Sequence, residues 1–306
     1  MKILVTGGSG FIGRSLVAAL VERGHQVAIF DRRHPSETGA VFPGVEATVG
    51  DIRDPDAVSA ALSAGTDAVL HLAAVTSVLK SKEDPIETFE TNVVATQTLL
   101  ERAREVGAGW FVMASTNAVA GDVGGTDISE GTVLAPLTPY GATKAAAEML
   151  MSAYTASYGI RCSAVRLTNV YGSGMKEKDS FVPRLMRAAL SGQRVAFYGD
   201  GTQRRDFIYV SDAVAGLLLP LETAVTGPLT IGFGTSYSVI DLHRNVCEVT
   251  GVEIPVTHEP PKPGEMPVVS VDTGRAKSFG FAPSVSLGDG LGRTWDDFRR
   301  MAAAAG

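Results

Sequence analysis

Cysteine is scarce in this 306-residue chain, with only Cys162 and Cys247, and both lie in apolar surroundings. A pair this sparse predicts buried free thiols rather than a disulfide or a metal site, which fits a reducing cytoplasm. The five histidines are scattered at spacings that suggest no ligand set, so we expect no bound metal.

The chain also lacks an apolar run of the roughly 18 residues needed to cross a membrane. Met1-Lys2 leads directly into an apolar strand, so we expect neither a secretory signal nor a membrane partner. A basic surplus is missing as well, because the formal net charge is -6. This balance argues against general affinity for nucleic acid, although a local pocket can still bind a small anion.

What the chain does have, up to Asn169, is a regular alternation of short β-branched runs and amphipathic segments. The predicted strands are Ile3–Thr6, Val27–Phe30, Glu46–Val49, Ala68–His71, Trp110–Ala114 and Cys162–Leu167. The predicted helices are Arg14–Arg23, Pro55–Ala64, Thr88–Val106 and Gly141–Tyr158. Such alternation indicates an α/β fold with a Rossmann-type, doubly wound parallel sheet.

The chain changes character after Asn169, where glycine and charged residues become frequent. We expect residues 1–168 to form a dinucleotide-binding domain, to which 206–236 returns. Residues 169–205 and 237–306 then make a smaller, discontinuous α/β domain that binds the substrate and closes over the cofactor. The length of the chain suits one large domain or two closely packed ones.

A glycine-rich turn follows the first predicted strand, where Thr6–Gly13 reads TGGSGFIG. Gly7 permits the tight turn, Gly10 lets backbone N–H groups approach a pyrophosphate, and Gly13 lets the helix pack close to the strand. The helix N-terminus adds unpaired donors and a partial positive charge. The alternative is an ordinary glycine turn. The cofactor contacts predicted here are Gly7, Gly10, Phe11, Ile12 and Gly13.

Asp31 ends the second apolar run, close to the offset of about 20 residues expected for a ribose-binding acid. Its carboxylate would accept hydrogen bonds from the ribose hydroxyls and repel a 2′-phosphate, which favours NAD over NADP. We include the neighbouring Arg32 among the predicted cofactor contacts.

Tyr140 and Lys144 stand at i and i+4, so both lie on one face of a predicted helix whose first turn begins with Pro139. A nearby ammonium stabilises phenolate and should lower the pKa of the tyrosine. A surface Tyr–Lys pair is the alternative. Ser115-Thr116, at a strand end, places hydroxyls at the same edge of the sheet.

These motifs together resemble the extended short-chain dehydrogenase/reductases, and within them the nucleotide-sugar epimerases and dehydratases. The resemblance covers essentially the whole chain. Besides the glycine turn and the Tyr140–Lys144 pair, it rests on Gly50–Asp54, His71–Ala74, Asn92-Val93, Ser115-Thr116 before Val119, Arg166–Gly172 and Arg205–Val210.

The resemblance implies catalytic roles for Thr116, which would hydrogen-bond the reacting sugar oxygen, and for Tyr140, the base. Lys144 would bind the nicotinamide ribose and tune Tyr140. Asn92 would touch the cofactor or only hold a helix. The remaining implied cofactor contacts are Asp51 and Ile52 at the adenine and Leu72, Ala73 and Ala74 along the phosphate and ribose.

For the sugar nucleotide, the resemblance implies that Asn169 contacts the diphosphate and that Arg205 clamps it. Lys262 stands where many relatives carry a second arginine, so it would bind phosphate less specifically or belong to the loop surface. The other implied substrate contacts are Ala196 and Tyr198, flanking a pyrimidine base, and Val182.

Two departures separate the possible reactions. The 4,6-dehydratases of the family place an Asp-Glu pair after the catalytic threonine, and uronate decarboxylases usually carry a Glu at the second position. This chain has Asn117 and Ala118 there. Neither side chain can transfer such protons, which disfavours both chemistries.

The resemblance therefore implies an NAD-dependent nucleotide-sugar 4-epimerase acting on a UDP-hexose or UDP-hexuronate. Tyr140 as phenolate would take the 4-OH proton, and the hydride would pass to NAD⁺ and return to the other face of a 4-keto sugar. A dehydrogenase or ketoreductase that releases NADH is the alternative. A non-catalytic cofactor sensor is disfavoured because Thr116, Tyr140 and Lys144 are all present.

Helices Thr88–Val106 and Gly141–Tyr158 carry apolar residues on more than one face, including Leu99, Leu100, Met149, Leu150 and Met151. Similar family members pair the equivalent helices across a two-fold axis. We therefore expect a homodimer.

Overall fold

The computed structural model describes residues 1–261 and 266–303. Its largest element is a seven-stranded sheet, parallel throughout, in the order β10-β6-β5-β4-β1-β2-β3. This confirms the predicted doubly wound sheet. The strands are β1 (Lys2–Thr6), β2 (Gln26–Asp31), β3 (Glu46–Val49), β4 (Ala68–His71), β5 (Trp110–Thr116), β6 (Arg161–Leu167) and β10 (Gly227–Ile231).

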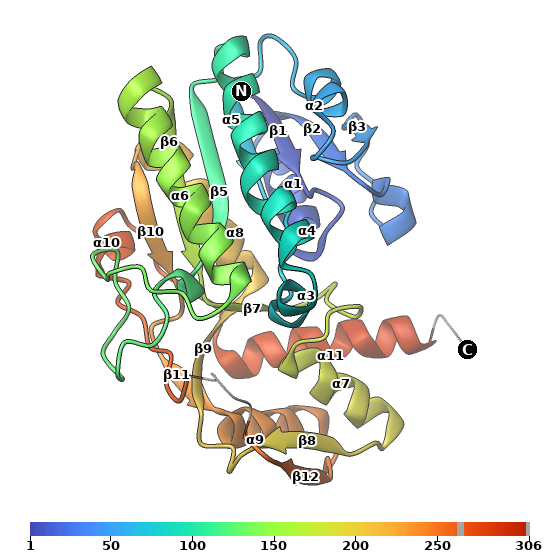
Figure 1. Ribbon diagram of the computed structural model, residues 1–306. Coiled ribbons are helices and arrows are strands. Elements are labelled where there is room, and N and C mark those ends of the chain that lie inside the picture. The colour runs from blue at the N-terminus through green and yellow to red at the C-terminus, as the bar shows by residue number, and fades with distance from the viewer. Residues whose placement is uncertain (262–265, 304–306) are drawn as a thin grey trace.

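Helices cover both faces of this sheet (Figure 1). Helices α1 (Phe11–Glu22) and α8 (Val210–Thr223) pack on one face, and α2 (Pro55–Ala61), α5 (Ala95–Val106) and α6 (Pro139–Tyr158) on the other. Alternate residues of β1 enter the two cores: Ile3 and Val5 join one, and Leu4 the other. A strand buried on both faces explains why its sequence is continuously apolar.

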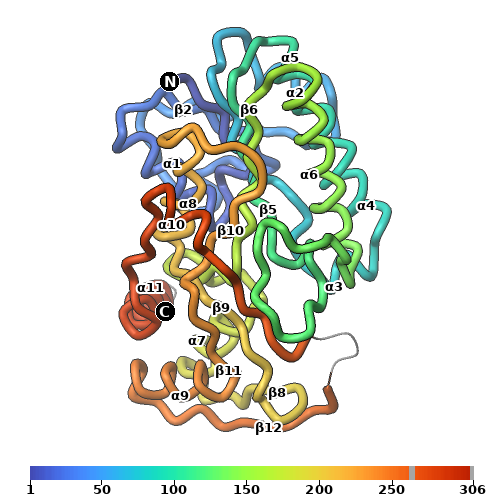
Figure 2. Tube along the Cα trace, turned by 90° about the vertical axis from the view of Figure 1, so that its left-hand side faces the viewer, coloured from blue at the N-terminus to red at the C-terminus, as the bar shows by residue number. Residues whose placement is uncertain are grey.

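A smaller α/β layer lies below the sheet (Figures 1 and 2). It has its own apolar core, to which Leu185, Val246 and Leu291 belong. Its strands form a three-stranded sheet, β11-β9-β7, and a two-stranded sheet, β12-β8. Its elements are β7 (Asn169–Tyr171), α7 (Phe181–Ser191), β8 (Val195–Tyr198), β9 (Arg204–Tyr209), β11 (Ser236–Ser238), α9 (Val239–Thr250), β12 (Val256–Glu259) and α11 (Leu287–Ala303).

Within the segment 206–236, β10 joins the large sheet and α8 packs on it, whereas β9 pairs with β7 and β11. The domain limits stay a prediction. The short helices are η1 (Pro35–Thr38), α3 (Val78–Glu83), α4 (Pro85–Phe89), η2 (Glu90–Val94), η3 (Asn117–Val119) and α10 (Gly274–Ser278). No helix in the described ranges is long and apolar enough to cross a membrane.

Residues 88–106 are helical as predicted, but the helix begins earlier, at Pro85, and is not α-helical throughout. The chain forms α4, then the π-helical turn η2, and only then α5. The π-helical turn contains Asn92, whose buried side chain bonds to the loop after β4. A widened turn of this kind inserts one residue and re-aims side chains without ending the helix.

Most of the apolar residues expected on the outer faces of these two helices are buried instead. Leu99, Leu100 and Met151 are buried in the core beneath α5 and α6, and Leu150 is half-buried. Met149 alone of the five is exposed. The sequence periodicity places apolar residues on two faces of each helix. Packing against the sheet and against the neighbouring helix buries most of the residues on both faces.

Candidate active site

The glycine turn lies between β1 and α1, beside the end of β4, where the strand order of the sheet reverses. The Gly7 N–H donates to the Phe30 carbonyl (2.9 Å), and the Gly10 N–H to the Gly7 carbonyl (3.0 Å). A Cβ on Gly13 would lie 2.1 Å from the Gly7 carbonyl oxygen, and one on Gly7 would lie 2.7 Å from Ala73 N. Neither position has room for a side chain.

The N-terminus of α1 fits a dinucleotide pyrophosphate. No side chain caps this helix at Gly10, so within the described chain the first N–H groups, those of Phe11, Ile12 and Gly13, have no side-chain partner there. Free N–H groups and the partial positive charge of a 12-residue helix suit phosphate oxygens.

Asp31 ends β2 with its carboxylate held beside this turn. Its Oδ2 accepts from the Ser9 N–H (3.0 Å) and its Oδ1 from the Arg33 N–H (3.1 Å). Each oxygen keeps a second lone pair for a ribose hydroxyl. The Arg32 side chain next to it is exposed.

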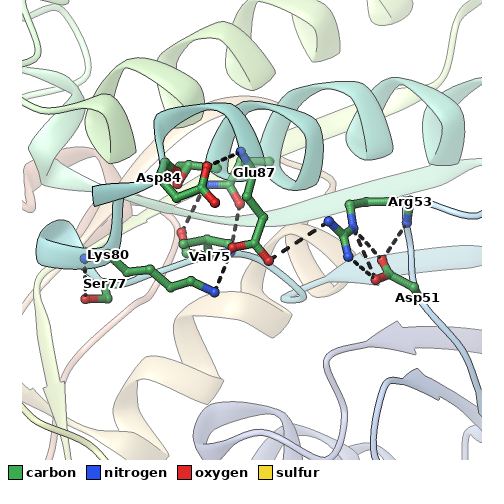
Figure 3. A network of polar contacts seen from close by, with 9 residues as sticks. Asp51, Arg53, Val75, Ser77, Lys80, Asp84 and Glu87 are labelled. Carbon is green, nitrogen blue, oxygen red and sulfur yellow. Dashed lines mark hydrogen bonds and ion pairs between the residues drawn. The ribbon is translucent and has the colours of Figure 1, made fainter. Parts of the chain in front are cut away.

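Asp51, the residue expected at the adenine, belongs to an ion-pair chain that Figure 3 shows. Arg53 donates hydrogen bonds to the Asp51 carboxylate from Nη2 (2.6 Å) and Nε (3.1 Å), and these bonds lower the pKa of Asp51. The Glu87 carboxylate lies 4.0 Å from Arg53 Nη1 and 2.8 Å from Lys80 Nζ. The chain of charges joins the β3–α2 turn to α3 and α4, while the Ile52 side chain is buried in the core.

The segment after β4 is tied to the end of β1. The Leu72 N–H donates to the Thr6 carbonyl (3.0 Å), and the Ala73 N–H to Thr6 Oγ1 (3.3 Å). Leu72, Ala73 and Ala74 are half-buried beside the glycine turn, where they can form one wall of the cofactor site.

The side-chain amide of Asn92 forms hydrogen bonds within the protein. Its Oδ1 accepts from the Val75 N–H (2.8 Å), and its Nδ2 donates to the Val75 carbonyl (3.0 Å) and to Thr143 Oγ1 (3.1 Å). Of the two roles weighed for this residue, the contacts favour holding the loop against the helices over touching the cofactor.

Thr116 and Tyr140 meet where β5 ends and α6 begins. Tyr140 is the second residue of α6, and its phenol lies close enough to the Thr116 side chain for Thr116 to influence its pKa. Gly141 allows this approach, because a Cβ there would lie 2.6 Å from the Ala118 carbonyl oxygen. Gly141 is not among the predicted site residues, because a glycine inside a helix by itself indicates only a lower helix propensity.

The expected lowering of the Tyr140 pKa is wrong, because the pKa is raised. Burial raises the pKa of Tyr140 to about 12, and only the nearby Thr116 side chain opposes this shift. Burial also lowers the pKa of Lys144 to about 8, against the attraction of Glu148. Desolvation outweighs the effect of Thr116 on Tyr140 and the charge of Glu148 on Lys144.

The predicted substrate residues lie in the smaller layer. β7 pairs with β9, so Asn169 and Arg205 stand on neighbouring strands, and Asn169 Nδ2 donates to the Asp206 carbonyl (2.9 Å). Val182 is buried in α7. Ala196 and Tyr198 are half-buried on β8.

Two hollows lie in this smaller layer. Tyr198, Gln203, Pro261 and Met266 help to line one of about 410 Å³. A larger hollow, of about 760 Å³, lies along α11 and contains none of the predicted residues. Lys262 lies outside the described residues.

Asp206 is a further residue of the site region that sequence analysis did not single out. Its buried carboxylate accepts from Thr168 Oγ1 (2.8 Å) and from the backbone N–H groups of Phe233 (2.9 Å), Gly234 (2.7 Å) and Thr235 (3.1 Å). It therefore holds the turn after β10 against the strand that carries Arg205. Asp206 belongs to the Arg205–Val210 motif, but the motif does not indicate which residues its carboxylate contacts.

Comparison with known proteins gives a consistent family. A family model described as the NAD dependent epimerase/dehydratase family matches residues 3–232. The chain is 33% identical over 314 residues to a dTDP-glucose 4,6-dehydratase of Streptomyces niveus, covering 98% of this chain and 93% of that one. It is 30% identical to a UDP-glucose 4-epimerase of Thermotoga maritima solved with UDP-glucose, with a TM-score of 0.94 and coverage of 99% and 100%. It is 35% identical to MoeE5, solved with UDP-glucuronic acid and NAD, with a TM-score of 0.89 and coverage of 98% and 100%.

Proposed function

This chain belongs to the NAD dependent epimerase/dehydratase family, and from that membership we propose that it is an NAD-dependent 4-epimerase of UDP-hexoses or UDP-hexuronates. The observation that carries the proposal is the Thr116–Tyr140 contact at the edge of the sheet where the glycine turn lies, with Lys144 one helical turn further along α6.

NAD is the cofactor, and its site fits the residues present. The α1 N-terminus would bind the pyrophosphate, Asp31 and Lys144 the two riboses, and Asp51 the adenine. The cofactor supplies a hydride acceptor that is regenerated in each cycle.

Tyr140 is the proposed base that takes the proton from the sugar 4-OH, and Thr116 orients the same oxygen. A phenol with a pKa near 12 does not ionise readily, so a positive charge near it must stabilise the phenolate. Lys144, with a pKa near 8, is still protonated at neutral pH and supplies that charge. The two residues therefore act as a pair.

The residues after Thr116 favour epimerisation over the other reactions of the family. Asn117 is buried in η3 and Ala118 turns its carbonyl toward α6. Neither side chain can donate or accept the proton that water elimination requires.

On the substrate side, we assign the diphosphate to Asn169, Arg205 and Lys262, and the base to Ala196 and Tyr198. Val182 would pack beneath the ligand from α7. These assignments rest on the matched motifs and on the β7–β9 pairing.

The test is incubation of the purified protein with UDP-glucose and with UDP-glucuronate, followed by NMR detection of the C4 epimers. We expect an epimer from at least one of a panel of nucleotide sugars, with NAD retained on the protein. No epimer from any of them would overturn the proposal. Steady accumulation of NADH, seen at 340 nm, would instead identify a one-way dehydrogenase or ketoreductase.

We also propose a homodimer formed through the outer helices. Ile86 and Phe89 on α4 and Met149 on α6 are 68%, 49% and 56% exposed, and α4 packs beside α6. We place the protein in the reducing cytoplasm, because Cys162 and Cys247 are unpaired thiols.

A further inference from the structure

A second buried polar cluster lies one helical turn beyond the candidate catalytic pair. Glu148 follows Lys144 by four residues on α6, so Tyr140, Lys144 and Glu148 lie along one stripe of the helix. The Glu148 carboxylate accepts hydrogen bonds from Ser115 Oγ (2.5 Å) and from Arg166 Nη2 (2.7 Å) and Nε (3.1 Å). The Glu148 and Arg166 side chains are each 3% exposed. The mechanism proposed above gives this cluster no task.

The cluster joins the elements that carry the candidate catalytic residues. Ser115 precedes Thr116 on β5 and lies opposite Arg166 on β6. One carboxylate therefore ties α6 to two strands, beside the strand end that presents Thr116. Arg166 Nη1 also reaches the carbonyls of Ser129 (3.4 Å) and Glu130 (3.5 Å), in the segment between β5 and α6.

The charge of Glu148 matters to Lys144 because few other charges reach it. His71, from β4, also faces Lys144, but burial lowers the pKa of His71 to about 3, so it is neutral at physiological pH. Burial raises the pKa of Tyr140 to about 12, so Tyr140 is a neutral phenol at physiological pH. The residues of α3, α4, η2, α5 and η3 that are buried are all uncharged. Without Glu148, the region would hold two buried cations, Lys144 and Arg166.

We propose that Glu148 is a positioning residue of the reaction. Held by Ser115 and Arg166, it fixes the stripe of α6 that carries Tyr140 and Lys144 relative to Thr116, and it balances the charge of Lys144. The inference rests on the proposed function, but Glu148 acts through Lys144 and not on the reacting atoms.

Glu148→Gln tests this directly, because it keeps the shape of the side chain and removes its charge. We expect kcat to fall roughly 10- to 100-fold at pH 7.5 from misplacement of the pair, with KM for the sugar nucleotide little changed. Glu148 opposes the lowering of the Lys144 pKa. The variant should therefore lose activity at a lower pH on the alkaline side than the wild type does.

Glu101→Gln is the matched control. Glu101 lies on α5, pairs with Arg104 and accepts from the Tyr154 hydroxyl of α6, but it is on the surface. The same chemical change there should leave kcat and the alkaline limb of its pH profile unaltered.

Two further variants separate positioning from a purely structural role. Glu148→Asp keeps the charge and shortens the reach, so kcat should fall while the alkaline limb stays in place. Glu148→Gln combined with Arg166→Met removes both buried charges, so no unpaired ion is left in the core. This double variant can therefore be tested even if the single variant does not fold. A double variant with wild-type kcat and a wild-type pH profile would overturn the proposal.

Titration with NAD distinguishes this inference from the proposed function, because it needs no sugar nucleotide. With Lys144 on the nicotinamide ribose, Glu148→Gln should begin to lose NAD affinity at a lower pH than the wild type. If the wild type epimerises nothing, the proposed function fails while this measurement still decides the role of Glu148. Coincident NAD profiles for the two proteins would reject that role.

Discussion

At the residue scale, the candidate site depends on one cation that water hardly reaches. Lys144 is 2% exposed, and no described residue forms a hydrogen bond or ion pair with its ammonium group. A buried charge with unused hydrogen-bonding capacity costs stability. Such a group is suited to a polar ligand that completes its bonds, which is the part assigned to the nicotinamide ribose.

The exchange of Tyr140 for Phe tests the base. We expect turnover to fall by roughly 10²- to 10⁴-fold, the usual contribution of a positioned general base, with NAD content nearly unchanged. Tyr158→Phe, at the exposed end of the same helix, is the control. The assignment of the base is wrong if Tyr140→Phe turns over at close to the wild-type rate.

The buried, neutral state of His71 should make the free energy of unfolding depend on pH. Its Nδ1 and Nε2 lie 2.7 and 3.0 Å from the hydroxyls of Thr6 and Thr96, and burial lowers its pKa to about 3. The folded chain therefore binds this proton more weakly than the unfolded chain, whose histidine titrates near 6.5. The stabilisation is complete above pH 6.5 and is lost as the pH falls toward 3, by about 2 kcal/mol between pH 7 and 5.

Urea denaturation of the wild type and of His71→Gln at pH 7 and pH 5 would measure this contribution. The variant should lose less free energy of unfolding between the two pH values than the wild type does. His258→Gln, at an exposed histidine, serves as the control. Equal losses in wild type and His71→Gln would contradict the neutral, buried state of His71.

At the element scale, the start of α6 determines whether the catalytic groups meet. Thr138 caps the helix by accepting from the Gly141 N–H (3.2 Å), and Pro139 suits its first position. These signals begin the helix so that Tyr140 falls on its first turn. The missing side chain of Gly141 then lets this turn approach η3, which follows Thr116.

Gly141→Ala sets two effects against each other. Alanine improves helix propensity by about 1 kcal/mol, but its Cβ would lie 2.6 Å from the Ala118 carbonyl oxygen and 3.0 Å from Pro136 Cβ. We expect the backbone contact to win, moving Tyr140 away from Thr116 and lowering kcat roughly 10- to 100-fold.

The matched control is Gly288→Ala, in the first turn of α11, where an added Cβ would meet no atom within 4 Å. It should keep wild-type kcat and gain a little thermal stability. Wild-type kcat in Gly141→Ala would show that the close approach is not needed.

At the scale of the whole molecule, the outer helices present an apolar face, made of Ile86, Phe89 and Met149, that no part of the described chain covers. Its members lie on α4 and α6, which pack side by side on the same side of the sheet (Figures 1 and 2). They are not the residues expected from periodicity, apart from Met149. An isologous pairing of this face with a second copy would bury it.

Light scattering at micromolar concentration should therefore give the mass of a dimer. Phe89→Glu should shift the protein toward monomer, because it would bury two symmetry-related charges in the interface. Val133→Glu places the same charge on an 81% exposed residue of the segment between β5 and α6 and should leave the mass unchanged. A monomer mass that persists as the wild type is concentrated would refute the dimer.

The sequence by itself determined the strand–helix alternation, the glycine turn with Asp31, and the Tyr140–Lys144 pair. These features are local: a turn, a strand period or a spacing of four residues has the same geometry wherever it occurs. They were enough to predict the doubly wound sheet and the family of the chain.

The tertiary structure alone decided what surrounds those residues. Glu148 meets Ser115 and Arg166 across 33 and 18 residues of sequence, and Asn92 meets Thr143 across 51. Burial set the pKa of Tyr140 against the direction expected from its charged neighbour. Desolvation and contacts between distant segments depend on how the whole chain packs, and no local pattern contains that information.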